Sequence, residues 1–189
     1  MAPQNTDLVI MLDESLSMRS REKAARMQME AILRRQNKRQ EQCRVSVLLA
    51  DAECRLLYDR VPIEVVHPPT KDGKRPGEAS ALRDAILKGI RYVERNQHDL
   101  KDEKHASKVV FQIISDGIDN TSHISRETLK EAIKQKQSLG WQFSYVCPEA
   151  ENALCRANRG ADNWDLLDRE RLNRRVEQVI QEIIANKKH

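Results

Sequence analysis

The feature that most constrains the fold is the apolar run at residues 7–12 (DLVIML), which opens with a charge and ends at Asp13. A short run without polar alternation is typical of a strand covered on both faces, as in a parallel sheet. Comparable runs occur at residues 44–50, 109–114 and 142–146. Segments with apolar residues at helical spacing separate them, so the chain is predicted to alternate strands with helices.

The segments between these runs show the apolar period of amphipathic helices. One helix is expected from its cap at Ser20 to about Arg39, and another is expected to end where Gly140 serves as its C′ residue. The apolar stripe of the helix between them consists of Ala81, Ala85, Ile86, Ile90 and Val93. A further amphipathic helix is expected over residues 168–186.

A second short strand is expected at residues 54–58, directly after the strand at 44–50. The short link makes this pair antiparallel, with Ala50 opposite Glu53. Residues 61–77 are rich in proline and are expected to form a long connection within one domain. The predicted fold class is α/β: a three-layer, Rossmann-like, doubly wound and mostly parallel sheet with one antiparallel edge strand, in a single domain over residues 1–189.

Composition limits the classes of function. Lys and Arg number 33 against 29 Asp and Glu, and this net charge of +4 permits an acidic partner without requiring one. No stretch approaches the roughly 20 consecutive apolar residues of a membrane span, so none is expected. The first residues contain neither the basic region nor the apolar region of a secretory signal, so no such signal is expected. The cysteines lack metal-ligand spacing and are expected to be idle thiols of a cytoplasmic protein.

Polar side chains follow the expected strands where each strand ends. The pattern D-x-S-x-S at residues 13–17 comes directly after the first strand, and Asp116 follows the strand at 109–114. Ser80 precedes a helix. Ligands of doubly wound sheets bind outside the carboxyl ends of the strands, so these oxygens are expected to converge. Oxygen ligands with retained waters suit Mg²⁺, or Mn²⁺ in its place.

These motifs resemble those of the von Willebrand factor type A domain. Its metal-ion-dependent adhesion site combines D-x-S-x-S, a Thr before a helix and an Asp after the fourth strand. The residues at the matching places are Asp13, Ser15, Ser17, Ser80 and Asp116. The resemblance covers roughly residues 5–160, and segments such as SDGIDN and GWQF resemble the small, single-domain intracellular bacterial branch. Leu16 replaces the usual Gly, and a Ser replaces the Thr.

The resemblance implies a non-catalytic protein-interaction module. A cation bound by neutral hydroxyls and few carboxylates stays under-neutralised, so an Asp or Glu side chain of a partner protein is expected to complete its ligands. No nucleophile with its base can be assembled from the strand-end loops, so no enzymatic activity is expected.

Other interpretations stay open beside this one. Each of the three serines could simply cap the helix that follows it. A magnesium-dependent phosphoryl-transfer enzyme also has an Asp after its first strand, although such an enzyme needs a second Asp where Ser15 stands. A ribonucleoprotein component could bind RNA through the basic clusters at residues 34–39 and 169–175. Only seven aromatic residues could stack on bases, so nucleic-acid binding is not expected.

Overall fold

The structure is a computed structural model that describes residues 5–38, 42–69, 80–99 and 108–148. The helix expected at 168–186 lies outside the described residues. The elements are, in chain order, β1 (Asn5–Asp13), η1 (Leu16–Arg21), α1 (Glu22–Asn37), β2 (Gln42–Ala50), β3 (Cys54–Pro62), η2 (Ile63–Val65), α2 (Leu82–Asp99), β4 (Lys108–Ile114), α3 (Arg126–Ser138) and β5 (Gln142–Val146). No helix of this described part is long and apolar enough to cross a membrane.

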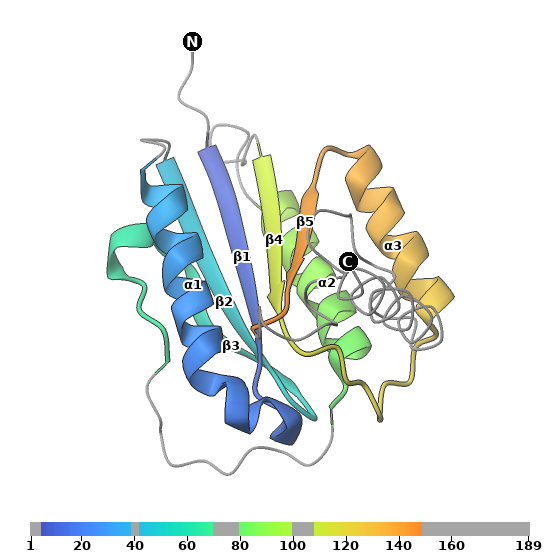
Figure 1. The fold of residues 1–189 in the computed structure, drawn as a ribbon. Helices are drawn as coiled ribbons and strands as arrows, with labels where there is room; N and C mark the ends of the chain where they lie inside the picture. Colours follow the sequence, from blue (N-terminus) through green and yellow to red (C-terminus); the bar gives the residue numbers. More distant parts are fainter. Residues whose placement is uncertain (1–4, 39–41, 70–79, 100–107, 149–189) are drawn as a thin grey trace, which may run out of the picture.

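The five strands form one sheet in the order β3-β2-β1-β4-β5 (Figure 1). β1 pairs in parallel with β2 and β4, and β4 pairs in parallel with β5, whereas β2 and β3 are antiparallel. The predicted mostly parallel sheet with one antiparallel edge strand is confirmed. The chain moves outward from β1 to β3 and then returns to the other side of β1 at β4. The carboxyl ends of β1 and β4 are therefore the point of reversal at which doubly wound sheets bind ligands.

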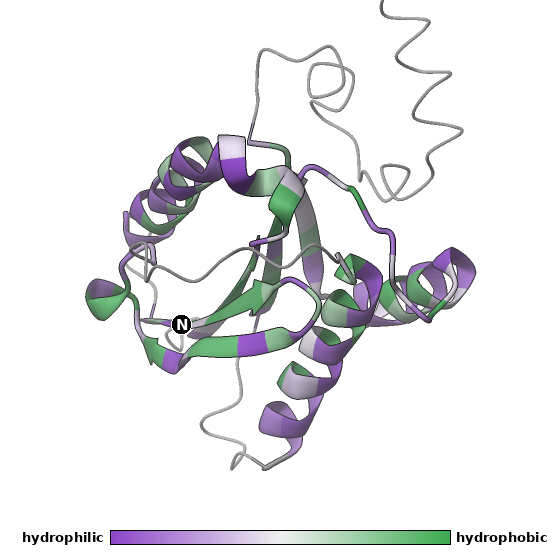
Figure 2. Ribbon diagram, turned by 90° about the horizontal axis from the view of Figure 1, so that it is seen from below, coloured by the Kyte–Doolittle hydropathy of each residue, from purple (hydrophilic) through white to green (hydrophobic). Residues whose placement is uncertain are grey.

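Helices cover both faces of the sheet, which confirms the predicted three layers. On one face, Met18 of η1 and Met29 of α1 pack against strand residues such as Ile10. On the other face, α2 and α3 cover a cluster around Phe111, with Ile86 of α2 among its fully buried side chains. Figure 2 looks toward the carboxyl ends of the strands and shows largely hydrophobic strands between helices whose hydrophilic sides face outward.

Gly89 lets α2 approach the sheet closely. A Cβ atom at this position would lie 2.8 Å from Cζ of Phe111 and 3.0 Å from Cδ1 of Leu48. Such distances are too short for a Cβ atom, so any larger residue at this position would require the surrounding side chains or the helix to shift. The packing depth of α2 in turn determines where its N-terminus, and Ser80 just before it, lie at the edge of the sheet.

Two local expectations are wrong. Ser20 does not start the first long helix, because residues 16–21 form η1 and α1 begins only at Glu22. In the hairpin, Ala50 pairs with Cys54 and not with Glu53. The Asp51 carboxylate accepts a hydrogen bond of 2.8 Å from the backbone N–H of Glu53, and this side-chain turn adds one residue to the link.

β3 continues to Pro62, four residues beyond its expected end, so the expected connection at 61–77 begins later. Its register with β2 shifts between Val45 and Leu48, which marks a bulge. Arg60 has a φ of 47°, and its guanidinium hydrogen-bonds to the buried carboxylate of Asp7. The bulge interrupts the alternation of side chains while the strand pairing goes on, so alternation could not predict this half of the strand.

The cysteines differ in state. Cys43 and Cys54 form no disulfide, as expected, and burial raises the pKa of the Cys54 thiol. Cys147, which follows β5, is disulfide-bonded. The expectation of idle thiols is therefore wrong for Cys147. The spacing of cysteines along a chain does not determine which of them the fold brings together.

Candidate metal centre

Asp13 ends β1 and is buried at the carboxyl edge of the sheet. Its Oδ1 accepts a hydrogen bond of 2.9 Å from the backbone N–H of Ser15, and its Oδ2 accepts one of 2.5 Å from the hydroxyl of Ser115. Burial raises the pKa of Asp13 above its ordinary value. The two serines act against this rise, and the nearby charge of Asp116 adds to it. A carboxylate in this setting is stabilised by any cation that can reach it.

The loop after Asp13 brings two hydroxyls together. Oγ of Ser15 lies 3.1 Å from Oγ of Ser17. Leu16 between them points outward and is 44% exposed. Among the described non-glycine residues only Arg60 has a positive φ, so the loop carries a leucine where the family often has glycine without backbone strain.

Asp116 follows β4 and faces the same region. Its Oδ1 accepts from the backbone N–H of Ile118 at 3.1 Å, and its Oδ2 lies 3.2 Å from Nη1 of Arg21. The same Nη1 donates to the backbone carbonyl of Ser17 at 2.7 Å. Arg21 therefore joins the loop after β1 to the loop after β4. The sequence gives no sign of this role, because an arginine at the end of a short helix has no distinguishing pattern.

Ser80 is buried just before α2, and it is tied to the loop after β4. Its hydroxyl donates to the carbonyl of Ile118 at 2.7 Å, and its N–H donates to Oδ1 of Asn120 at 2.8 Å. Both partners belong to the loop that begins at Asp116. Asp13, Ser15 and Ser17 are linked to one another more directly.

The loop after β4 also caps α2 from outside the helix. Oδ2 of Asp119 accepts from the backbone N–H of Arg83 at 2.8 Å, and the Ser122 hydroxyl accepts from the N–H of Asp84 at 3.2 Å. The Asp84 carboxylate accepts in return from the N–H of His123 at 3.0 Å and lies 2.9 Å from its Nδ1. These bonds hold the N-terminus of α2, and with it Ser80, against the loop that carries Asp116.

No protein-family model and no curated protein matches the sequence significantly, but solved structures share its fold. Proximal thread matrix protein 1 from the mussel byssus aligns with a TM-score of 0.50 at 15% identity, over 77% of this chain and 36% of that one. An aerotolerance-related membrane protein from Bacteroides fragilis aligns with a TM-score of 0.50 at 17% identity, over 75% of this chain and 67% of that one.

A third match is the ArnB paralog VWA2 from Sulfolobus acidocaldarius, with a TM-score of 0.48 at 16% identity over 77% of this chain and 35% of that one. The mostly parallel five-stranded sheet of this chain, with one antiparallel edge strand and flanking helices, agrees with a Rossmann-like α/β fold. The chain has a von Willebrand factor type A-like fold. Similarity at this level of identity shows the fold only, and the chain spans about a third of the mussel protein's length.

The donor atoms in this type A-like fold fit a hard divalent cation. Neighbouring ligands of an octahedral Mg²⁺ with bonds of about 2.0–2.1 Å lie about 2.9 Å apart, close to the 3.1 Å between the hydroxyls of Ser15 and Ser17. Within the described ranges, no group of three or more His, Cys, Asp or Glu side chains could hold a metal ion. A site at the strand ends must therefore depend on serine hydroxyls as well as on carboxylates.

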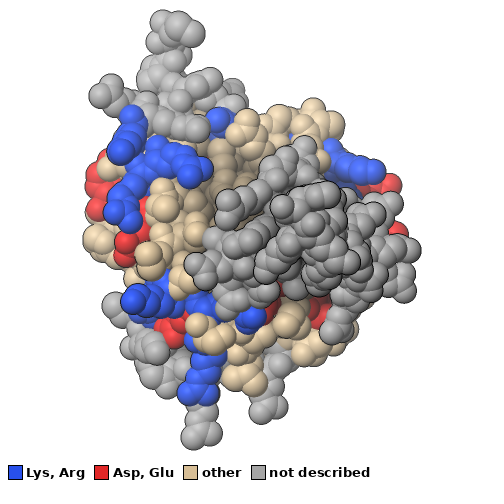
Figure 3. Space-filling view, viewed as in Figure 1, with Lys and Arg blue, Asp and Glu red and all other residues tan. Residues whose placement is uncertain are grey.

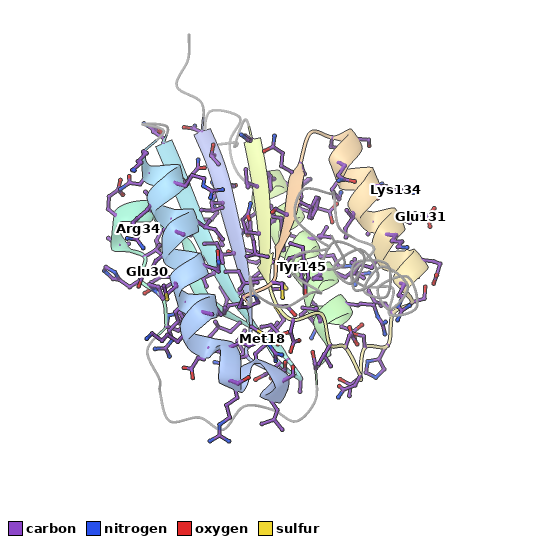
Figure 4. The ribbon with its side chains drawn as sticks, in the orientation of Figure 1. Met18, Glu30, Arg34, Glu131, Lys134 and Tyr145 are labelled. Carbon is purple, nitrogen blue, oxygen red and sulfur yellow. The ribbon has the colours of Figure 1, made fainter. Side chains whose placement is uncertain are left out.

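Tyr145 of β5 is a second residue that the sequence analysis missed (Figure 4). Its hydroxyl is buried near Ser115 without a hydrogen bond of good geometry. Burial raises the pKa of Tyr145 well above its ordinary value, and the charges of Asp13 and Asp116 add to the rise. Its place at the end of an edge strand could be predicted from the sequence, but its position next to the acidic pair follows from the pairing of β4 with β5.

Proposed function

We propose that the protein is a non-catalytic interaction module that binds Mg²⁺, or Mn²⁺ in its place, and captures an Asp or Glu side chain of a partner protein. The proposed ligands are Asp13, Ser15, Ser17, Ser80 and Asp116. The observation that carries the proposal is the pair of hydroxyls 3.1 Å apart beside the buried Asp13 carboxylate. Helix capping by the serines would not require two buried carboxylates at the same place.

The bound ion would supply a positive charge with an exchangeable ligand position. Ser15 and Ser17 contribute neutral oxygens, and only Asp13 and Asp116 contribute charge. Ser115 and the backbone N–H of Ser15 orient the Asp13 carboxylate, and the N–H of Ile118 orients that of Asp116. With so few charged ligands in the protein, a carboxylate from outside is a favourable addition.

The edge of the candidate site favours a protein partner. Leu16 and Ile118 belong to the loops that follow β1 and β4, and they are 44% and 48% exposed. Contiguous exposed apolar surface marks protein-binding sites, and these two side chains are proposed as part of such a surface. A partner with an apolar residue next to its acidic one would suit this surface.

The phosphoryl-transfer alternative has less support. His123 lies on the same side of the sheet, but its side chain is 92% exposed and is bonded to Asp84. Ser115 donates to a carboxylate as a nucleophile would, yet it is fully buried and cannot meet a substrate. Neither residue forms a nucleophile and base pair that opens toward solvent.

The RNA-binding alternative rests on basic clusters, of which the one at 169–175 lies outside the described residues. Figure 3 shows Lys and Arg over the α1 side of the molecule with Asp and Glu between them. Arg34 lies 3.3 Å from Glu30 one turn away, on the outer side of α1 (Figure 4). Such mixed charge is typical of a solvated helix face and unlike a phosphate-binding stripe.

A cytoplasmic location is part of the proposal, and the cysteines bear on it in opposite ways. Cys43 and Cys54 form no disulfide, whereas Cys147 is disulfide-bonded. Structural disulfides persist mainly in oxidising compartments. Fractionation of the native host with an antibody against the protein tests the location, and recovery in an extracytoplasmic fraction would contradict it.

Calorimetry with MgCl₂ and MnCl₂ tests the metal proposal directly. Protein first treated with chelator should release or absorb heat with at least one ion, and Ser15→Ala and Ser17→Ala should lose this signal. Ser138→Ala is the matched control, because its hydroxyl donates to the carbonyl of Gln135 in α3 and is far from the strand ends in sequence. Absence of heat and of a melting shift in the wild type would show that the metal proposal is wrong.

A further inference from the structure

Arg21 contacts the candidate site at two points through one nitrogen. Its Nη1 lies 3.2 Å from Oδ2 of Asp116 and 2.7 Å from the carbonyl oxygen of Ser17. The Asp116 side chain is 6% exposed and the Arg21 side chain 23% exposed. The guanidinium is therefore more exposed than the carboxylate that it contacts.

We propose that Arg21 competes with the divalent cation for Asp116 and so limits the metal affinity of the site. This inference rests on the proposed function. A guanidinium keeps its positive charge at every relevant pH, so it cannot leave the carboxylate by losing a proton. An ion that uses Oδ2 of Asp116 must displace Nη1 of Arg21 or share the oxygen with it, and both cost part of the ion's binding energy.

The contact to Ser17 makes the competition specific to Arg21. The carbonyl that accepts from Nη1 belongs to a residue whose hydroxyl is a proposed ligand. A movement of Arg21 away from Asp116 therefore also releases the backbone of the D-x-S-x-S loop. Arg19 lies on the same short helix, η1, and is exposed, so it carries the same charge nearby and provides the matched comparison.

The experiment compares the dissociation constant for Mg²⁺ of the wild type, Arg21→Gln and Arg19→Gln by calorimetry on chelator-treated protein. A partly exposed ion pair is worth up to about 1 kcal/mol, which corresponds to an affinity change of about fivefold. Arg21→Gln should bind Mg²⁺ about fivefold more tightly than the wild type. Arg19→Gln should change the affinity by less than twofold, because only long-range charge is lost.

A second variant tests the same competition in case Arg21→Gln does not fold. Arg21→Met keeps the apolar stem and removes the charge, and it should tighten Mg²⁺ binding similarly. Equal affinities of the Arg21 and Arg19 variants, or weaker binding without Arg21, would overturn the competition while leaving the metal site in place. If the wild type takes up no ion, the proposed function itself fails, and the competition fails with it.

Discussion

The hydroxyl of Ser115 donates a 2.5 Å hydrogen bond to Oδ2 of Asp13, and the bond crosses from the end of β4 to the end of β1. Ser115 is fully buried, and its backbone N–H donates to the carbonyl of Val146 at 3.1 Å. One residue thus connects the ends of three neighbouring strands at the point where the strand order reverses. It fixes the orientation of the carboxylate that we propose as a metal ligand.

Ser115→Ala is expected to weaken Mg²⁺ binding by about tenfold while the protein stays folded. Removal of a residue that orients a metal ligand commonly lowers the affinity for the metal by about 10- to 100-fold. Calorimetry on the chelator-treated variant measures the effect. Ser144→Ala on β5 serves as the control and should bind as the wild type does. Unchanged affinity in Ser115→Ala would mean that other contacts hold Asp13 in place.

Asp13→Asn is expected to abolish Mg²⁺ binding without unfolding the protein. Asparagine keeps the shape of the side chain and removes a buried negative charge that lies close to Asp116, so the metal-depleted variant should melt no lower than the wild type. Calorimetry and thermal melting in excess chelator measure the two effects. Asp51→Asn, in the exposed hairpin turn, is the control for binding. A melting temperature well below that of the wild type would assign Asp13 a structural role.

The buried Asp7 at the opposite end of β1 predicts a pH dependence of stability. Burial raises the pKa of Asp7 above its ordinary 3.8, although the Arg60 guanidinium and the Gln97 amide act against the rise. The folded chain therefore keeps this proton after the unfolded chain has lost it. The contribution to the free energy of unfolding is fully present below pH 3.8 and is lost as the pH rises through the raised pKa.

Denaturant unfolding of the wild type and Asp7→Asn over a pH series checks this sign. The wild type should lose stability relative to the variant as the pH rises from below about 4. Glu131→Gln, on the outer side of α3 (Figure 4), is a control for charge removal at the surface. If the wild type instead gained stability relative to Asp7→Asn as the pH rose, the ion pair with Arg60 would outweigh burial.

Gly89→Ala is expected to lower the free energy of unfolding by about 1–3 kcal/mol. The new Cβ would meet Phe111 at 2.8 Å and Leu48 at 3.0 Å, and overpacking of a filled core costs about this much. Denaturant unfolding measures it. Gly140→Ala separates this effect from backbone strain, because nothing lies within 4 Å of its Cβ position while its φ is 86°. A neutral Gly89→Ala would show that α2 can move away from the sheet.

Much of the sheet could be predicted because its strands are short apolar runs. The boundaries of β5 agree to the residue with the expected 142–146, and those of β4 differ by one. The prediction failed where a side chain changes the backbone path. Asp51 lengthens the hairpin link, and Arg60 with Asp7 supports the bulge that lets β3 continue. These contacts join residues that are polar in sequence and give no periodic signal.

In the candidate site, too, some residues could be predicted from the sequence and others could not. Asp13, Ser15 and Ser17 were predictable because one short motif contains them, and the structure joins them by direct hydrogen bonds. Arg21 and Ser115 were not predictable. Each acts through a contact between the loops after β1 and β4, which are about a hundred residues apart in the chain. The sequence therefore indicates which residues carry the oxygens, whereas the fold determines which neighbours orient or neutralise them.

Binding of an acidic peptide is expected to require both the metal ion and a carboxylate. An array of peptides with Asp or Glu next to an apolar residue, each paired with its Asn or Gln counterpart, can be tested in Mg²⁺ and in excess chelator. Loss of one buried charged partner costs about 2–5 kcal/mol, so either change should weaken binding by more than tenfold. Arg34→Gln with Arg35→Gln should mainly change the association rate and its salt dependence, because these side chains are exposed on α1. Peptides that bind equally well in chelator, or that bind equally well as amides, would remove the ion from the mechanism and leave the exposed Leu16 and Ile118 as the binding surface.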